Sequence, residues 1–352
     1  MLKLTCISPI DGSVYAERNL QTKTVIDTIV KNAQIAQNAW KNIILESRIA
    51  TIEKAVDALE TMNDEIVVEL AHMMGRPVRY GGEIGGVKER TSHMISIAAD
   101  ALAPNYIENT EAGTFVGVGL ELGGKDPSYV RADADVDVAV KTLIDGAMFN
   151  GGQSCCGIER IYVDESLFDT FIQKAKVIVE AYVLGNPLDS ATTLGPMANV
   201  RFADEVRGQV KDALKSGATS IINKSLFPRD TGSDAYIAPE ILIDVDHTMR
   251  VMRDEGFGPV VGIMKVSSDE QVIELMNDSV FGLTASIWTK DLNAAMAIGN
   301  QIETGTVFMN RCDYLDPALC WTGCKDTGRG ISLSSLGYQS VTRAKSYHMK
   351  KA

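Results

Sequence analysis

Short apolar runs alternate with amphipathic stretches over most of the chain, from Val116 to Met309. The runs have the length of buried strands, and the intervening stretches repeat apolar residues at helical spacing. This alternation favours a mostly parallel β-sheet covered by helices, which places the region in the α/β class. The expected strands are 161–163, 219–222, 260–266, 284–288 and 305–309, and the expected helices are 136–147, 166–184, 201–215, 269–276 and 292–302.

The residues before this region have a different pattern. Apolar residues recur at the spacing of one helical face over 25–40 and again over 52–70, and Gly75 follows the second face. Glycine commonly ends a helix. A third helix is expected over 87–102, so the first part of the chain is predicted to be helical.

Composition excludes several classes of partner. Of the 352 residues 45% are hydrophobic and 23% are charged, and the formal net charge is −12. Nucleic-acid binding needs clustered Lys and Arg, which this acidic sequence does not offer. No apolar run approaches the roughly 20 residues that cross a bilayer, and no signal-peptide pattern opens the sequence. We therefore expect neither nucleic acid nor a membrane as a partner.

The cysteines and histidines are scattered along the sequence. The spacing of the six cysteines matches no disulfide framework, and the four histidines lie far apart. Neither set has the spacing of a zinc site. We expect a cytoplasmic protein with no metal.

The first run that carries chemistry is E-L-G-G-K, from Glu121 to Lys125. A carboxylate at the end of a strand, followed by two glycines, can be exposed at the floor of a cleft and act as a general base. Read alone, a solvated turn glutamate is the commoner outcome. We expect no chemical role for Lys125.

The second run, Phe149 to Gly157, places Cys155 and Cys156 on a glycine-rich turn between a helix and a strand. Open backbone N–H groups in such a turn can lower the pKa of a thiol and later stabilise an oxyanion. A buried structural cysteine is the alternative. We assign that alternative to Cys156 and keep Cys155 as the candidate nucleophile.

The third run is E-G-F-G-P, which begins at Glu255. A carboxylate and an aromatic ring two residues apart on a rigid Gly-Pro turn could hold a ribose and press against a nicotinamide. Out of context, the run indicates only a turn with a packed Phe257.

These three runs, in this order, resemble the signature of the aldehyde dehydrogenase superfamily. Supporting segments resemble the family at 194–197, 281–283, 305–310 and 323–330. The resemblance is strong over 113–352 and moderate over 1–110. Residues 319–325 depart from the family's P-F-G-G-x-K, which is compatible with a different substrate tunnel.

The resemblance implies an oxidoreductase that converts an aldehyde to a carboxylic acid with NAD or NADP. The Cys155 thiolate would attack the aldehyde, the thiohemiacetal would lose hydride to the cofactor, and Glu121 would activate the water that hydrolyses the thioester. Glu255 would hold the nicotinamide ribose, and Phe257 would pack beside the nicotinamide ring. Members of the family form dimers or tetramers, so a homo-oligomer or a hetero-oligomer with a full-length relative is implied.

The resemblance also implies an aldehyde dehydrogenase-like fold in three segments. Residues 1–112 would be a truncated, helical remnant of the Rossmann-type cofactor-binding domain with a truncated oligomerisation hairpin. Residues 113–335 would be an intact catalytic α/β domain with a parallel sheet. Residues 336–352 would supply a C-terminal oligomerisation strand.

An internal deletion is expected between about Asn109 and Gly113. Family members carry most of the dinucleotide-binding fold there, including a P-W-N motif whose asparagine completes the oxyanion hole. A nucleotide domain needs on the order of 100 residues. Its loss should weaken NAD(P) binding and expose apolar faces of the helices within 1–110.

The sequence therefore predicts an aldehyde dehydrogenase with impaired NAD(P)-dependent turnover. Three alternatives stay open: a cofactor-independent cysteine esterase or thioesterase, a non-catalytic subunit or scaffold, and a deletion product without a role.

Overall fold

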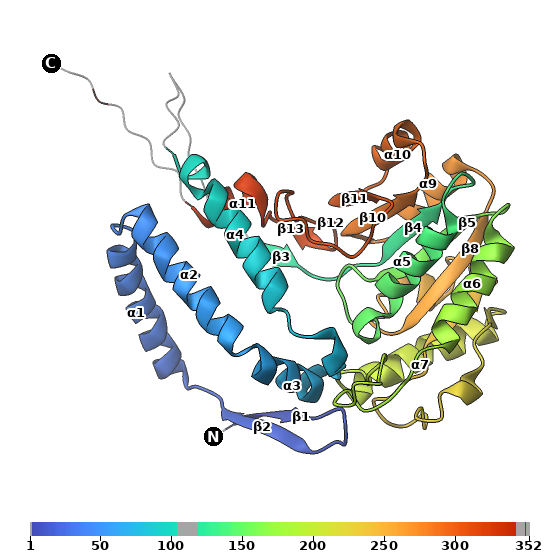
Figure 1. Cartoon of the computed structure of the whole chain (residues 1–352), viewed down its shortest axis with the longest axis horizontal. Coiled ribbons are helices and arrows are strands. Elements are labelled where there is room, and N and C mark those ends of the chain that lie inside the picture. The colour runs from blue at the N-terminus through green and yellow to red at the C-terminus, as the bar shows by residue number, and fades with distance from the viewer. Residues whose placement is uncertain (1, 104–118, 343–348, 350–352) are drawn as a thin grey trace. The chain divides into compact units, whose positions relative to one another are not determined.

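The computed structural model describes residues 2–103, 119–342 and 349. The chain divides into two compact units, which are described separately below (Figure 1). Both units are discontinuous in sequence, whereas the three predicted segments are contiguous. The expected deletion junction, 109–113, lies outside the described residues. Unit 1 consists of Met1–Thr91, Val183–Ala203 and Arg229–Ile237, and unit 2 of Ser92–Tyr182, Asp204–Pro228 and Ala238–Ala352.

Unit 1 opens with an antiparallel hairpin that the sequence did not predict. Its strands, β1 (Lys3–Ile7) and β2 (Val14–Asn19), are mostly exposed and so lack a strong alternation of apolar and polar residues. The connecting turn is held locally, because the Asp11 carboxylate accepts hydrogen bonds from the Ser13 backbone N–H at 2.9 Å and the Ser13 hydroxyl at 2.7 Å. Asx turns of this kind are an ordinary local device for reversing a chain.

The helices of unit 1 confirm the predicted helical pattern. Thr22 caps the first helix, and Gly75, at a φ of 79°, ends the third. A Cβ on Gly75 would lie 2.0 Å from the Pro196 carbonyl oxygen, so the 194–197 segment packs directly on this turn. The helical elements are α1 (Lys23–Trp40), α2 (Leu45–Thr61), α3 (Asn63–Met74), η1 (Val78–Tyr80) and α4 (Ile84–Ala101), the last of which ends in unit 2.

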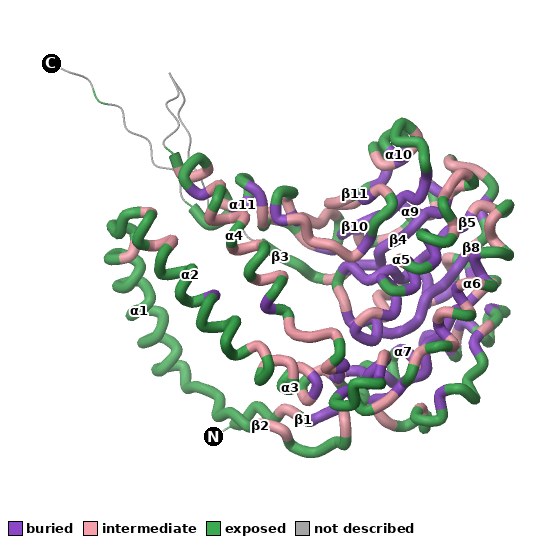
Figure 2. Tube along the Cα trace, viewed as in Figure 1, coloured by how far each residue is buried: buried purple, intermediate pink, exposed green. Residues whose placement is uncertain are grey.

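The apolar face of α1 is not covered. The helix has no buried residue, and its apolar side chains include Ile29, Val30 and Ile35, which are 56%, 53% and 61% exposed. Figure 2 draws the helix as exposed along its length. The expected exposure of apolar helical faces is therefore seen in this helix.

Unit 2 is built on a seven-stranded sheet, and its strands confirm the predicted α/β class. Neighbouring strands run parallel except at the β6–β7 edge, where the pairing is antiparallel. β4 and β5 are buried along almost their whole length, as strands covered on both faces must be. The order is β11 (Thr306–Met309), β10 (Thr284–Trp288), β4 (Asp126–Val130), β5 (Ile158–Asp164), β8 (Val260–Val266), β7 (Glu240–Ile243) and β6 (Thr219–Ser220).

Helices cover this sheet and bury its core. α5 contacts β4, β5 and β8, α6 contacts α5 and β5, and α9 contacts β4. The fully buried side chains include Trp288, Tyr129 and Phe171. The helical elements of unit 2 are α5 (Val136–Met148), η2 (Phe149–Gly152), α6 (Phe168–Glu180), η3 (Lys224–Leu226), α8 (Arg250–Arg253), α9 (Asp269–Asn277) and α10 (Leu292–Gly299), together with α7 (Val200–Lys215), which begins in unit 1. Across the part of the chain that the structure describes, no helix has the length and apolar character needed to cross a membrane.

Two small antiparallel sheets and a helix complete unit 2. β12 (Cys324–Lys325) pairs with β9 (Phe281–Gly282), and β13 (Gly328–Arg329) pairs with β3 (Leu120–Glu121). The strand predicted for 336–352 begins inside a helix, because α11 covers Ser334–Val341. The Tyr338 hydroxyl on this helix donates to the Met94 carbonyl at 2.7 Å. Residues 343–348 and 350–352 of the predicted strand lie outside the described residues.

Candidate active site

Three turns within unit 2 carry the three runs singled out from the sequence. Glu121 lies on β3, Cys155 follows η2 and precedes β5, and Glu255 with Phe257 lies between α8 and β8. Cys155 is exposed, while Cys156 is buried as predicted. The candidate nucleophile is therefore accessible at the carboxyl end of a helix and the start of a central strand.

Close backbone approaches join the three turns. A Cβ on Gly124 would lie 2.6 Å from the Cys155 carbonyl oxygen, and a Cβ on Gly152 would lie 2.0 Å from the Gly258 carbonyl oxygen. Such distances exclude any side chain at these two positions. The Gly124 N–H also donates to Glu255 Oε1 at 2.9 Å. The structure thus brings the E-L-G-G-K, G-Q-S-C and E-G-F-G-P runs together.

The turn before Cys155 is held by its own side chains. Asn150 adopts a positive φ of 54°, which asparagine tolerates better than most residues. Its Nδ2 donates to the Gln153 carbonyl at 3.0 Å, and Gln153 Nε2 donates to the Asn150 carbonyl at 2.9 Å. These reciprocal bonds fix the shape of the turn that presents the thiol.

Hydrogen bonding and nearby charges shift the pKa of Cys155 in opposite directions. A hydrogen bond from the Cys156 side chain lowers the pKa of Cys155, and this effect outweighs desolvation and the charges of Glu121 and Asp313, which raise it. The net shift favours the thiolate, the form that acts as a nucleophile. Glu121 is exposed on its strand.

Glu255 and Phe257 project from a turn with unusual backbone geometry. Phe257 has a φ of 50° and remains 39% exposed, although it is a large aromatic residue. Burial raises the pKa of Glu255, and the Gly124 N–H opposes that shift. A partly buried carboxylate beside an exposed ring suits a ligand with hydroxyl groups next to a flat ring.

A buried ion pair, which the sequence reading missed, supports this turn. The Lys125 ammonium donates to the Glu159 carboxylate, and the two side chains are 1% and 8% exposed. Glu159 also accepts hydrogen bonds from the backbone N–H groups of Gly256 at 2.8 Å and Phe257 at 3.2 Å. A charged residue within the apolar strand run I-E-R-I-Y-V was the available signal, because a buried charge needs partners.

A second missed residue is Asp313, in the loop after β11. Its Oδ1 accepts hydrogen bonds from the Cys156 thiol at 2.9 Å and from the Ser154 hydroxyl at 3.0 Å. Asp313 has a positive φ of 47°. No nearby motif marks this aspartate, so the sequence offered no signal for its contacts with Ser154 and Cys156.

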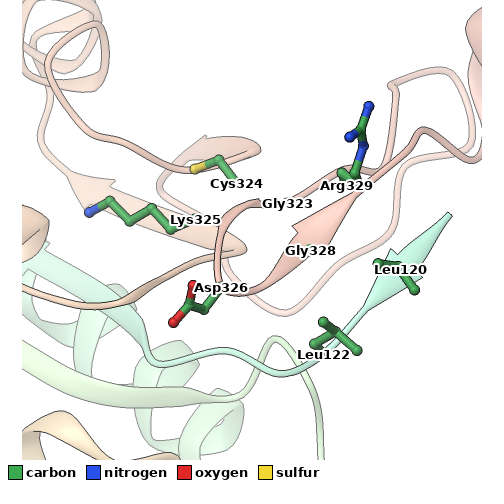
Figure 3. A pocket seen from close by; sticks show the side chains of 8 residues that line it. All are labelled: Leu120, Leu122, Gly323, Cys324, Lys325, Asp326, Gly328 and Arg329. Carbon is green, nitrogen blue, oxygen red and sulfur yellow. The ribbon is translucent and has the colours of Figure 1, made fainter. Parts of the chain in front are cut away.

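A pocket of about 760 Å³ lies beside β3 (Figure 3). Leu120 and Leu122 line it, whereas Glu121 does not. Because side chains alternate between the two faces of a strand, Glu121 points away from this pocket. The remaining lining residues belong to the 323–329 segment, so the pocket is separate from Cys155.

Sequence comparisons identify relatives of the chain. The model of the "Aldehyde dehydrogenase family" matches residues 2–84 and 86–347. The mitochondrial aldehyde dehydrogenase of Homo sapiens is 28% identical over 356 residues, covering 97% of this chain and 68% of that protein. A succinate-semialdehyde dehydrogenase [NADP(+)] of Mycobacterium avium is 36% identical over 226 residues, covering 64% of this chain and 47% of its own length. The chain thus spans about half to two thirds of the length of these curated relatives.

Solved structures share the fold. A variant aldehyde dehydrogenase from Bacillus cereus superposes with a TM-score of 0.89 at 20% identity, covering 97% of this chain and 92% of that one. A succinic semialdehyde dehydrogenase from Streptococcus pyogenes, solved with NADP+, gives a TM-score of 0.86 at 22% identity, covering 96% and 97%. With the family model matched over almost the whole sequence and the three motif turns assembled around Cys155, the chain belongs to the aldehyde dehydrogenase family.

Proposed function

We propose that the chain is an aldehyde-oxidising enzyme whose acyl-transfer site is Cys155 with Glu121, and that weak retention of NAD(P) limits its turnover. The observation that carries the proposal is the exposed Cys155 thiol with a lowered pKa, on a turn locked to the two other motif turns. The proposed substrate is a small-molecule aldehyde.

The residues of unit 2 account for the acyl chemistry as follows. The Cys155 thiolate attacks the aldehyde carbon and forms a C–S bond, and the carbonyl oxygen takes up a proton. Bound NAD(P) would supply the acceptor for the hydride that leaves this carbon. Loss of this hydride from the carbon and of the proton from the oxygen leaves a thioester, and Glu121 removes a proton from the water that attacks it. The carboxylic acid leaves, and the Cys155 thiol is regenerated.

Glu255 and Phe257 fit the nicotinamide end of such a cofactor. The Glu255 Oε1 atom is engaged by the Gly124 N–H, and the carboxylate sits against Gly123, where a Cβ would be 2.7 Å from it. This contact orients the carboxylate, whose second oxygen can accept a ribose hydroxyl. The exposed Phe257 ring can cover a nicotinamide.

Impaired cofactor retention follows from the proposed internal deletion. Among the described residues, the one sheet with more than two strands is the unit 2 sheet, which carries Cys155 and Glu255. The uncovered face of α1 and the partial coverage of the curated relatives also support a deletion. Most binding energy for a large cofactor comes from its unreactive parts, so nicotinamide-side contacts alone should bind weakly.

Calorimetric titration with NAD+ and NADP+ tests the proposed weak retention of the cofactor. An assay of aldehyde-dependent NAD(P)H formation, run beside it, tests the proposed aldehyde oxidation. We expect dissociation constants weaker than about 1 mM, and slow turnover that Cys155→Ala abolishes. Micromolar binding would contradict the impaired retention. The absence of Cys155-dependent NAD(P)H formation at every cofactor concentration would contradict the dehydrogenase assignment.

A cofactor-independent hydrolase is the second candidate. It is favoured by the placement of Cys155 and Glu121 in one unit, since thioester or ester hydrolysis needs no hydride acceptor. Steady-state hydrolysis of a p-nitrophenyl ester without cofactor tests it. If Cys155→Ala hydrolyses the ester as fast as the native chain, this candidate is ruled out.

A further inference from the structure

The two neighbours of the nucleophile converge on one carboxylate. Ser154 and Cys156 flank Cys155 in sequence, and both donate hydrogen bonds to Oδ1 of Asp313, at 3.0 and 2.9 Å. The Ser154 oxygen and the Cys156 sulfur are 3.7 Å apart. Residues on both sides of the nucleophile are therefore anchored to a loop that is far away in sequence.

The Cys156 thiol has a single proton, which it donates to Asp313 Oδ1. Its hydrogen bond with the Cys155 sulfur is the largest effect that lowers the pKa of Cys155. Its contact with Asp313 is also a hydrogen bond, and Asp313 helps to raise the pKa of Cys156. Donation to the Asp313 carboxylate therefore competes with donation to a Cys155 thiolate.

The charges around Cys155 and Asp313 make the competition for the Cys156 proton important. Carboxyl groups from three elements interact electrostatically with this pair: Glu121 on β3 and Asp126 on β4 with Cys155, and Asp145 on α5 with Asp313. Arg311 lies in the same loop as Asp313, and its guanidinium stacks on the Tyr314 ring at 3.3 Å. In acidic surroundings, a thiolate depends on hydrogen-bond donors to be stabilised.

We propose that Asp313 is a positioning residue for Cys155: its carboxylate holds the Ser154 hydroxyl and the Cys156 thiol, and so restrains the two residues that flank the nucleophile. The Asp313 carboxylate fixes the turn, and it also keeps the Cys156 proton partly away from Cys155. This inference rests on the proposed nucleophilic role of Cys155.

The pH dependence of Cys155 alkylation by iodoacetamide, measured on the full chain and located by peptide mass spectrometry, tests the proposal. We expect Asp313→Asn to shift the midpoint of the pH–rate curve downward by on the order of half to one pH unit, because one nearby negative charge and the stronger acceptor are both removed. Asp316→Asn is the matched control. Asp316 lies in the same loop and accepts a hydrogen bond from the Ala318 N–H at 2.9 Å, so its substitution should leave the midpoint unchanged.

A second pair of variants tests the donor itself. Cys156→Ala should shift the midpoint upward by on the order of half to one pH unit, because the donor is lost. Cys156→Ser restores a donor and should return the midpoint close to that of the native chain. A purely structural role for Cys156 would not produce this opposite shift and its rescue.

An unchanged or raised midpoint in folded Asp313→Asn would overturn the proposal, and so would an unchanged midpoint in Cys156→Ala. If Asp313→Asn does not fold, the Cys156→Ala and Cys156→Ser variants alone test the proposal. Alkylation requires no cofactor and no turnover. A chain that oxidises no aldehyde would therefore contradict the proposed function while leaving this test intact.

Discussion

Gly152 lies so close to Gly258 that a Cβ on Gly152 would be 2.0 Å from the Gly258 carbonyl oxygen. This contact joins the turn that presents Cys155 to the turn that carries Glu255 and Phe257. Gly152 also has a φ of 72°, a backbone conformation that side chains rarely adopt. The contact and the backbone both require glycine.

Gly152→Ala should therefore separate the two turns. We expect the free energy of unfolding to fall by more than about 2 kcal/mol, because of the clash and the positive φ together. The rate at which Cys155 is alkylated should change as well. Gly208→Ala is the control, because Gly208 lies in α7 with open space around its Cα. That variant should be neutral or more stable by up to about 1 kcal/mol. Equal urea denaturation curves for Gly152→Ala and the native chain would contradict the packing described here.

The buried pair of Lys125 and Glu159 gives a second prediction. Glu159→Gln should cost about 3 to 5 kcal/mol of unfolding free energy, because the Lys125 charge is left buried without its counter-charge. The double variant Lys125→Met with Glu159→Gln should recover most of that loss, since no charge then remains buried. Chemical denaturation measures both. A double variant no more stable than Glu159→Gln would show that the charge is not the cause.

His247 gives a prediction about pH. Its Nε2 hydrogen-bonds with the Tyr162 hydroxyl at 2.9 Å and its Nδ1 with Asp278 at 2.7 Å. Burial lowers the pKa of His247, and the Asp278 carboxylate only partly opposes this. Below the unfolded pKa of about 6.5 the unfolded chain therefore binds the proton more readily than the folded one, and stability is lost as the pH falls.

The difference in the free energy of unfolding between the native chain and His247→Gln, here called the gap, should therefore become smaller as the pH is lowered from about 7.5 to about 5.5. His93→Gln serves as the control for a general effect of removing a histidine. Urea denaturation at several pH values gives the gap directly. A gap that widens on acidification would mean that the folded state favours the charged imidazole.

Asp126 is a buried carboxylate, and burial raises its pKa well above the usual range. It accepts a hydrogen bond from the Thr284 N–H at 3.0 Å and another from the Thr284 hydroxyl. A raised pKa means that stability is lost as the pH rises through the folded value. Asp126→Asn removes this loss and keeps the Thr284 N–H acceptor. It should match or exceed the native stability at neutral pH, whereas Asp126→Ala should lose about 1 to 3 kcal/mol; thermal denaturation separates the two outcomes.

The sequence predicted several strands of the large sheet and missed others, among them β4 and β7. β8 and β10 were placed at the bounds that the structure shows, because V-V-G-I-M-K-V and T-A-S-I-W read as strands. β4 reads D-P-S-Y-V, with a proline that argues against a central strand. The structure accommodates it with a register shift between Asp126 and Pro127. Its polar side chains are paired across strands, which a sequence pattern does not reveal.

Some residues of the candidate site could likewise be predicted from the sequence, and others could not. Glu121, Cys155, Glu255 and Phe257 could be named from the sequence because they lie in short contiguous motifs. Asp313 could not, because it reaches Ser154 and Cys156 from a loop more distant in sequence than any motif spans. Local patterns identify groups that react, whereas partners brought in by the fold become visible only in three dimensions.

The central claim is that Cys155 and Glu121 form a working acyl-transfer site, and intact-protein mass spectrometry after mixing with p-nitrophenyl acetate tests it most directly. We predict a single acetyl adduct on Cys155 that forms without cofactor, is absent from Cys155→Ala, and accumulates in Glu121→Gln because deacylation is slowed. An unmodified Cys155, or an adduct that decays equally fast in Glu121→Gln, would contradict the account.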